Sequence, residues 1–156
     1  MKRAVVYYSL TGCTKKTAEA IAGKTGADLI RIDTVKEMPA GFKSRIMYGG
    51  MLATFGIKPK IKDLPCDLSS YDDIILGTPV WASTFAPALK TLFASADISS
   101  KVTSVFTYSG SGDNGKCLAK LSKILPNIKN TVSLLDEGKG PREENKVPLE
   151  SFIAKL

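Results

Sequence analysis

Short apolar runs alternate along this chain with segments in which apolar residues recur every three or four positions. The apolar runs are rich in β-branched and aromatic residues and predict strands over residues 4–8, 28–32, 74–76, 102–108 and 131–135. The helical spacing predicts a helix that Gly23 and Gly26 end, and further helices over residues 85–96, 118–125 and 149–156.

This alternation predicts an α/β fold in which helices cover both faces of a doubly wound parallel sheet. Five strands in a chain of 156 residues favour a single domain over residues 1–156. The segment over residues 34–70 is too long for a simple connection. Its middle is weakly helical, and Gly49 and Gly50 are expected to interrupt that helix.

Unusual residues gather in three segments that follow predicted strands. These are SLTGCT after the first strand, GTPVWASTFAP after the third and TYSGSGDNG after the fourth. Open parallel sheets bind ligands beyond the carboxyl ends of their strands, where the strand order reverses. We therefore expect these three segments, interpreted as loops, to surround a ligand.

The first loop combines hydroxyl groups with the start of a helix. Ser9, Thr11 and Thr14 supply three hydroxyls, and residues 12–15 supply backbone amides that have no partner within the helix. Such a cluster binds a phosphate dianion without arginine. A Ser/Thr-rich turn that only caps the helix is the alternative interpretation.

The third loop matches two other phosphate-binding patterns in part. G-S-G-D-N-G over residues 110–115 satisfies G-x-G-x-x-G and has Asp136 downstream, but a dinucleotide fold carries this pattern on its first strand. The following Lys116 and Cys117 nearly complete a P-loop that lacks its final hydroxyl. A glycine-rich turn that ends with Asp113 as the N-cap of a helix explains the same residues.

The motifs of the three loops together resemble those of the flavodoxin family. S-x-T-G-x-T resembles the loop that binds the phosphate of FMN in flavodoxins, and ILGTPVWASTFAPALKTLF resembles the family's G-T-P-x-W…P-x-L-x-x-F segment. The third loop resembles the turn on the far side of the flavin. This resemblance extends over residues 2–125 and implies FMN as cofactor and a five-stranded sheet of order 2-1-3-4-5.

The resemblance also implies which residues contact FMN. Those expected at the phosphate are Ser9, Thr11, Gly12, Cys13 and Thr14. Those expected along one edge and face of the isoalloxazine are Thr78, Pro79, Val80 and Trp81. Those expected on its other side are Tyr108, Ser109, Gly110, Gly112 and Asp113.

Three of these residues also have another interpretation. Core packing would explain Trp81, expected in a loop, and Tyr108 at a strand end. A helix start can lower the pKa of a thiol such as Cys13. A neighbouring phosphate would oppose the thiolate, so the Cys13 amide is the expected functional group.

Composition excludes several kinds of chemistry. The chain has no histidine, which excludes Ser-His-Asp and Cys-His catalysis and nearly every imidazole metal site. Its three cysteines include no C-x-x-C pair, so neither a disulfide framework nor a zinc site is favoured. No apolar run approaches the roughly 20 residues of a membrane span. We expect a cytoplasmic protein with no catalytic side chain of its own and no metal.

The formal charge is +7, and it is unevenly distributed. Residues 43–62 contain five basic side chains and no acidic one, which indicates either a solvated face or a docking patch for an acidic partner. Nucleic acid is disfavoured, because no nucleic-acid-binding motif is present. The three loops contain a single acid, Asp113, so we expect a less negative two-electron couple than in acidic flavodoxins.

Three functions remain open from the sequence. The first is an electron carrier that transfers electrons to or from a partner protein through an acidic surface of that partner. The second is an FMN-dependent NAD(P)H or quinone reductase with an apolar substrate pocket built from Phe42, Met47, Tyr48, Met51 and Phe55, although core packing explains those residues equally well. The third is a subunit that has lost its flavin.

Overall fold

The computed structural model describes residues 1–138 and 140–156, and of Phe42 only the backbone. Five parallel strands form the sheet, in the order β2 (Asp28–Arg31), β1 (Arg3–Tyr7), β3 (Asp73–Trp81), β5 (Val102–Ser109) and β6 (Asn130–Leu135). A short β4 (Thr84–Phe85) pairs antiparallel with the end of β3, off this path. The predicted order 2-1-3-4-5 of the parallel strands is confirmed.

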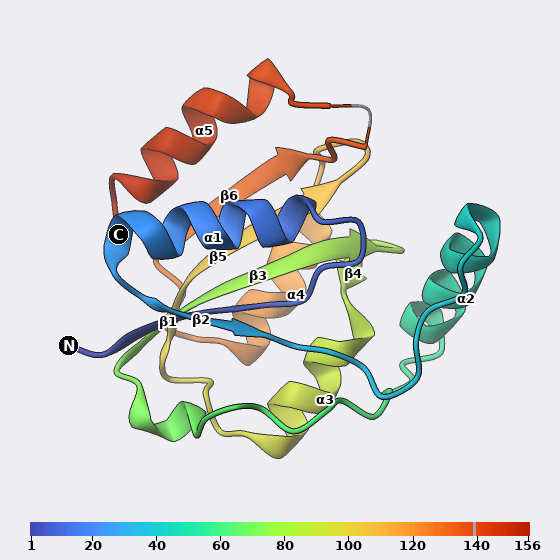
Figure 1. The fold of residues 1–156 in the computed structure, drawn as a ribbon, viewed down its shortest axis with the longest axis horizontal. Helices are drawn as coiled ribbons and strands as arrows, with labels where there is room; N and C mark the ends of the chain where they lie inside the picture. Colours follow the sequence, from blue (N-terminus) through green and yellow to red (C-terminus); the bar gives the residue numbers. More distant parts are fainter. Residues whose placement is uncertain (139) are drawn as a thin grey trace.

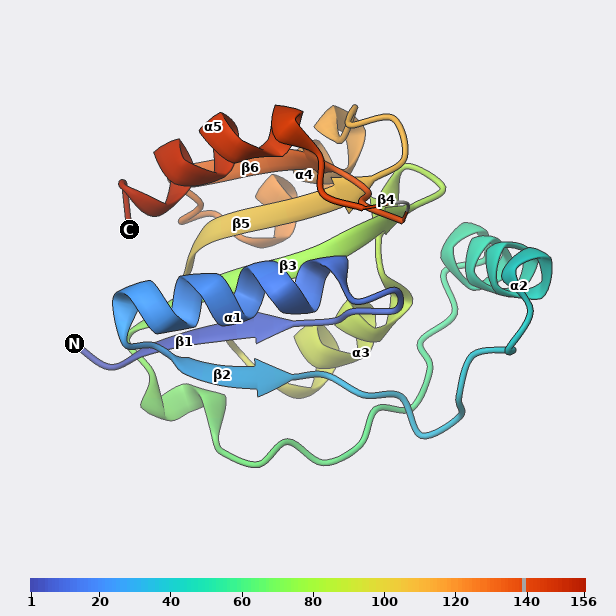
Figure 2. The same ribbon diagram turned by 45° about the horizontal axis from the view of Figure 1, so that its top comes forward.

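Helices cover both faces of the sheet (Figure 1). One face carries α1 (Cys13–Thr25) and α5 (Glu143–Ile153), and the other carries α3 (Pro87–Ser95) and α4 (Gly115–Ile124). The remaining helix, α2 (Phe42–Thr54), lies beyond the carboxyl ends of the strands, as Figure 2 shows. In the described residues, no helix has the length and hydropathy that a bilayer crossing requires.

Two buried clusters follow from the alternation of side chains along each strand. Val5 and Tyr7 belong to the cluster beneath α1 and α5, whereas Val6 packs in the cluster beneath α3 and α4. In β3, Ile75 and Leu76 likewise point to opposite faces. The central strands β1, β3 and β5 therefore bury side chains on both faces, as expected for a sheet covered on both sides.

Several element boundaries differ from those predicted. α1 continues through Gly23 and ends at Gly26, whose φ of 69° is the left-handed conformation that favours glycine. α5 begins at Glu143, well before the predicted residue 149. Its first turns are polar and contain Pro148, so they lack the apolar helical spacing on which the prediction relied. β3 is nine residues long and includes residues 77–81, which were predicted to form a loop.

The predicted interruption of α2 at its two glycines is wrong, because the helix runs through both. Gly49 is buried against β3, and a methyl group there would lie 3.2 Å from Cε3 of Trp81 and 3.4 Å from Cε of Met38. Gly50 faces open space. The absence of a side chain at position 49 therefore lets α2 lie close to the end of the sheet.

We predict that Gly49→Ala displaces α2 from Trp81, whereas Gly50→Ala stabilises the protein. Alanine at position 50 gains about 0.5–1 kcal/mol of helix propensity without a clash. At position 49 the added methyl group would press on the Trp81 ring, and this ring is held because it packs edge-on against Tyr8 with the two ring centroids 5.7 Å apart. The clash therefore offsets the gain in helix propensity. Urea unfolding and the emission of this single tryptophan measure both effects. Equal stability and identical emission in the two variants would contradict the prediction.

Candidate functional site

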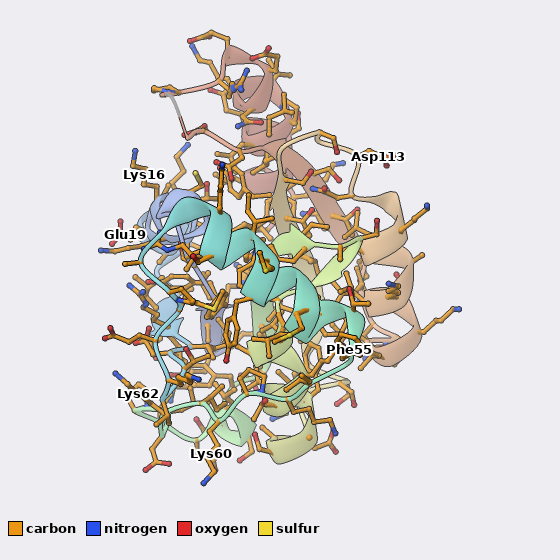
Figure 3. The ribbon with its side chains drawn as sticks, turned by 90° about the vertical axis from the view of Figure 1, so that its right-hand side faces the viewer. Lys16, Glu19, Phe55, Lys60, Lys62 and Asp113 are labelled. Carbon is orange, nitrogen blue, oxygen red and sulfur yellow. The ribbon has the colours of Figure 1, made fainter. Side chains whose placement is uncertain are left out.

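The loops after β1 and β5, the end of β3 and the helix α2 surround one cavity at the carboxyl end of the sheet. Its volume is about 530 Å³, within the range of roughly 300–1,000 Å³ that is typical of small-molecule sites. Figure 3 looks onto this end of the molecule, with α2 nearest the viewer. The residues that line the cavity are Leu10, Thr11, Arg45, Ile46, Gly49, Gly50, Pro79, Val80, Trp81, Ala82, Tyr108, Ser109, Gly110 and Asp136.

The predicted phosphate loop forms the start of α1. Gly12 is the N-cap with φ of 100°, no side chain among the described residues forms a capping hydrogen bond, and the first turn of α1 contains no acid. Ser9 Oγ accepts a hydrogen bond from the Gly12 amide at 3.1 Å, which holds the turn closed. Thr14 is only 2% exposed, in the first turn of the helix. The positive end of the α1 dipole is therefore free to bind an anion at this turn.

Cys13 connects this turn to the end of β6. Its thiol donates to Oδ1 of Asp136 at 3.4 Å and accepts from Thr11 Oγ1 at 3.7 Å. Burial raises the pKa of the Cys13 thiol, and the Asp136 carboxylate adds to this effect, while hydrogen bonds from the Glu137 backbone and Thr11 oppose it. The lowering of the thiol pKa that a helix start can produce is therefore outweighed here by burial and by Asp136.

The second predicted loop is the end of a strand followed by a hairpin. Thr78 is fully buried, and its hydroxyl accepts from the Ala86 amide at 3.0 Å and donates to the Pro79 carbonyl at 2.8 Å. It therefore fastens the end of β3 to the start of α3. Ala82 and Ser83 form the tip of the hairpin with φ of 48° and 58°.

Two consecutive non-glycine residues in the left-handed region cost backbone energy, and such strain persists where surrounding structure enforces it. In this hairpin, the pairing of β3 with β4 encloses the turn, and Ala82 lines the cavity. The strained turn therefore fixes the rim of the site.

Two aromatic residues predicted at the flavin lie at the cavity in different ways. Trp81 is half-buried at the end of β3, where its ring meets Tyr8 edge-on. Tyr108 is 4% exposed, and its hydroxyl lies 2.7 Å from Thr17 Oγ1 in α1. Burial raises the pKa of Tyr108 to about 12. Tyr108 is therefore a neutral wall fixed to α1, whereas Trp81 presents its ring to the cavity.

Side chains within the third loop hold its own backbone. Ser109 Oγ accepts from the Gly112 amide at 2.9 Å, Ser111 Oγ from the Asp113 amide at 3.3 Å, and Asp113 Oδ1 from the Gly115 amide at 3.4 Å. These bonds occupy amides that a P-loop or dinucleotide loop would offer to phosphate. The N-cap of α4 is Asn114 and not Asp113 as proposed.

The structure divides the predicted site residues into two sets. Those that line the cavity are Thr11, Pro79, Val80, Trp81, Tyr108, Ser109 and Gly110. Those that lie within three positions of a lining residue in the chain are Ser9, Gly12, Cys13, Thr14, Thr78, Gly112 and Asp113. Of the residues expected in an apolar substrate wall, Met47, Met51 and Phe55 are exposed and, like Tyr48, do not line this cavity, and the side chain of Phe42 lies outside the described residues.

Sequence reasoning missed the cavity residues that come from α2 and from the end of β6. Arg45 lies on α2, where its Nε donates to the Pro39 carbonyl at 2.9 Å. Asp136 follows β6, the end of which is held because Asn145 donates to the Leu135 carbonyl at 2.8 Å and accepts from its amide at 2.7 Å. The position of Asp136 directly after the last strand was the signal that could have identified it.

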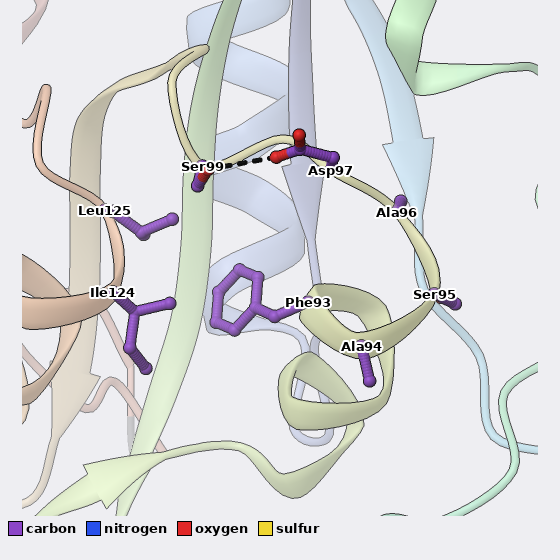
Figure 4. Close-up of a pocket in the computed structure, with 8 residues that line it drawn as sticks. All are labelled: Phe93, Ala94, Ser95, Ala96, Asp97, Ser99, Ile124 and Leu125. Atoms are coloured by element: carbon purple, nitrogen blue, oxygen red, sulfur yellow. Dashed lines mark hydrogen bonds between the residues drawn. The ribbon is translucent and has the colours of Figure 1, made fainter.

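A second cavity of about 290 Å³ lies where α3 and α4 end, at the opposite edge of the sheet (Figure 4). Its lining is about equally polar and apolar, and its large apolar residues are Phe93, Ile124 and Leu125. The polar groups Ser99 and Asp97 bond to each other at 3.0 Å. This cavity is remote from the three predicted loops and offers no comparable set of donors.

Comparisons with solved structures find the same architecture in flavoproteins. A candidate flavoprotein from Bacteroides eggerthii has a TM-score of 0.79 at 21% identity, with 99% of this chain and 97% of that chain covered. One from Bacteroides uniformis has a TM-score of 0.77 at 22% identity, with 96% and 97% covered. A Lactobacillus acidophilus flavoprotein solved in complex with FMN has a TM-score of 0.68 at 23% identity, with 97% of each chain covered.

The comparison with curated protein sequences gives no significant match. The model of a family described as flavodoxin matches residues 2–150, which is nearly the whole chain and includes every element around the cavity. This chain belongs to the flavodoxin family.

Proposed function

We propose that this chain is an FMN-binding electron carrier that works as one domain over residues 1–156 with a redox partner protein. The observation that carries the proposal is the position of the α1 start beside the cavity. Thr11 lines the cavity, and the uncapped turn from Gly12 to Thr14 follows it directly. One ligand with a phosphate and a broad apolar ring system would use both features.

The donor set fits FMN. Hydroxyls from Ser9, Thr11 and Thr14 and the free amides of the α1 start suit a phosphate dianion. The cavity wall is mostly apolar, with Val80, Trp81 and Tyr108 along its sides, which suits an isoalloxazine. FMN is the cofactor that the membership in the flavodoxin family supports.

When bound, the flavin would supply the electron-transfer chemistry, and the protein would supply binding, orientation and electrostatics. The α1 start would hold the phosphate, and the strained hairpin at Ala82 and Ser83 would fix the rim. α2 would cover one side through Ile46 and Gly49 and limit the access of water. Because the raised pKa keeps the Cys13 thiol protonated, its side chain would not repel the phosphate at this turn.

The three cysteines are free thiols, two of them buried, and this state suits the reducing cytoplasm in which we place the carrier. The raised pKa values of Cys13 and Cys117 keep both thiols protonated, and burial raises that of Cys117 to about 12. Electron transfer through this protein is therefore assigned to the cofactor and not to thiol exchange.

We predict that Thr14→Val and Thr11→Val each weaken FMN binding. A hydrogen bond to a charged group contributes about 1.5–3 kcal/mol, which corresponds to a loss of roughly 10- to 150-fold in affinity. Thr25→Val is the matched control, because Thr25 lies at the other end of α1 and bonds to the Ile21 carbonyl at 2.8 Å. Quenching of FMN fluorescence measures the dissociation constants.

Circular dichroism of each variant shows whether its fold is retained. Two results would overturn the proposed function: no quenching of FMN by the unmodified protein, or an equal loss of affinity in the Thr25 control. The first result would instead favour a flavodoxin-fold subunit without flavin.

The charges around the cavity set the expected reduction potential. The cavity contains one acid, Asp136, and one base, Arg45, among its lining residues. Two-electron reduction adds negative charge to the flavin, and the opposite charges of Asp136 and Arg45 nearly cancel in their effect on it. The potential of the two-electron couple is therefore expected to be less negative than in an acidic flavodoxin. The net charge of +7 acts in the same direction.

We predict that Asp136→Asn raises the potential of the two-electron couple and that Arg45→Gln lowers it. A unit charge about 10 Å away, at an effective dielectric constant of about 20, contributes roughly 1.7 kcal/mol, or about 35 mV in a two-electron couple. Asp97→Asn, at the opposite edge of the sheet, serves as the control. Potentiometric titration measures all three, and shifts of the same sign for Asp136 and Arg45 would refute the electrostatic account.

The position of Arg45 favours a second candidate function, an FMN-dependent NAD(P)H or quinone reductase. A guanidinium in the cavity wall suits the phosphates of a pyridine nucleotide, and α2 would form part of the substrate site. Mixing the FMN-loaded protein with NADH or NADPH under argon separates the two functions. A carrier keeps its flavin absorbance until a partner is added, whereas a reductase loses it within the time of mixing.

A further inference from the structure

The outer face of α2 exposes large apolar side chains. Met47, Met51 and Phe55 follow one another at intervals of four residues and are 75%, 42% and 75% exposed. We call these three residues the α2 stripe. Figure 3 shows Phe55 at the end of α2, on the side that faces the viewer.

The α2 stripe is not the side of α2 that packs against the rest of the protein. The opposite side of α2 is already packed, because Leu52 and Ala53 are buried and Gly49 lies against Trp81. Exposed apolar groups in a row on a helix that is already anchored are typical of interaction surfaces. Methionine in particular adapts its flexible side chain to varied partners.

Three lysines lie beside the C-terminal end of α2. Lys90 from α3 and Lys120 and Lys123 from α4 line an open depression of about 530 Å³ that Ala53 and Thr54 of α2 also line. We call this depression the lysine groove. Lys90 Nζ lies 3.7 Å from where a methyl group on Gly56 would be, directly after Phe55 of the α2 stripe. The two features are therefore continuous.

The lysine groove has no counter-charge of its own. Its lining contains no acid, and within the described ranges none of its three lysines lies within 4.0 Å of a carboxylate. Three ammonium groups around one depression repel one another and attract an anionic occupant. Lys120 and Lys123 are exposed to solvent, and Lys90 is partly exposed, so all three ammonium groups are accessible to a partner.

We propose that the α2 stripe and the lysine groove together form the docking surface for an acidic protein partner. The partner fits by placing carboxylates in the lysine groove and an apolar side chain against Met51 and Phe55. This inference rests on the proposed electron-carrier function and names its docking site and the kind of partner. A second copy of the chain is disfavoured, because two molecules of charge +7 repel each other.

The docking surface lies next to the cofactor cavity. Ala82, at the tip of the hairpin, lines both the lysine groove and the cavity, and Ile46 of α2 lines the cavity while remaining 61% exposed. A partner seated on this surface is thus separated from the cavity only by the hairpin and α2. That position suits electron transfer between the two proteins.

The test measures electron transfer from the reduced, FMN-loaded protein to cytochrome b5, a haem protein with an acidic surface, by stopped-flow absorbance. Lys90→Gln, Lys120→Gln and Lys123→Gln are combined in one docking variant. The control variant combines Lys24→Gln in α1, Lys146→Gln in α5 and Lys155→Gln after α5, which remove the same charge from exposed positions. Cytochrome c, with a basic surface, is the second acceptor.

We expect the rate constant with cytochrome b5 to fall as salt is added, and to be about tenfold lower in the docking variant at low salt. The control variant should stay within about twofold of the unmodified protein. Met47→Gln combined with Phe55→Gln should lower the rate at high salt as well, since it removes apolar contact. Reduction of cytochrome c should not slow in the docking variant.

An equal effect of the docking and control variants would overturn the docking surface while leaving the carrier function intact. Failure to bind FMN, or to reduce either cytochrome, would overturn the carrier function. Amide shifts of the isotope-labelled protein on addition of oxidised cytochrome b5 test docking without electron transfer, and shifts at Thr54, Thr84 and Lys120 are expected. Shifts there with inorganic pyrophosphate but not with cytochrome b5, or self-association alone, would contradict a protein partner.

Discussion

The continuation of β3 beyond the end of its neighbour β1 is the constraint on which the carboxyl edge of the sheet depends. β1 pairs with β3 only as far as Gly77, whose carbonyl accepts from the Tyr8 amide, while β3 continues to Trp81. The backbone N–H and C=O groups of successive residues in a strand point alternately to its two neighbours. The backbone nitrogen of Pro79 therefore faces the same side as the Gly77 carbonyl, where β1 has already ended. Its missing amide hydrogen therefore costs no ladder bond, and a proline is tolerated in a central strand.

The rest of the site is attached to this extension of β3. On one side it stays paired with β5 up to Pro79 and Tyr108, which brings the start of the third loop to the cavity. At its tip, pairing with β4 forces Ala82 and Ser83 into the left-handed region. Beyond it, α2 rests on Trp81 through Gly49. A shorter β3 would leave the hairpin and α2 without support, and the cavity would lose most of its wall.

The sequence was informative where a residue's local surroundings decide its structure. Five apolar runs marked the parallel strands, and the spacing of Ser9, Thr11 and Thr14 marked the start of α1. It failed where distant contacts decide. Residues 79–81 look like a loop, because only pairing with β5 and β4 shows that Pro79 can lie in a strand. The raised pKa of Cys13 likewise depends on burial and on Asp136, which lies 123 positions away.

The basic surface would act on electron transfer twice if the carrier and docking proposals both hold. Lysines near the cofactor favour the more negative, reduced flavin, and the same lysines attract the acidic partner. When the partner's carboxylates enter the lysine groove, they neutralise part of that positive charge and make the reduced flavin less favourable. By thermodynamic reciprocity, the partner then binds the oxidised carrier more tightly than the reduced one. Docking therefore lowers the potential of the flavin at the moment of contact, which favours transfer toward the partner and opposes its return.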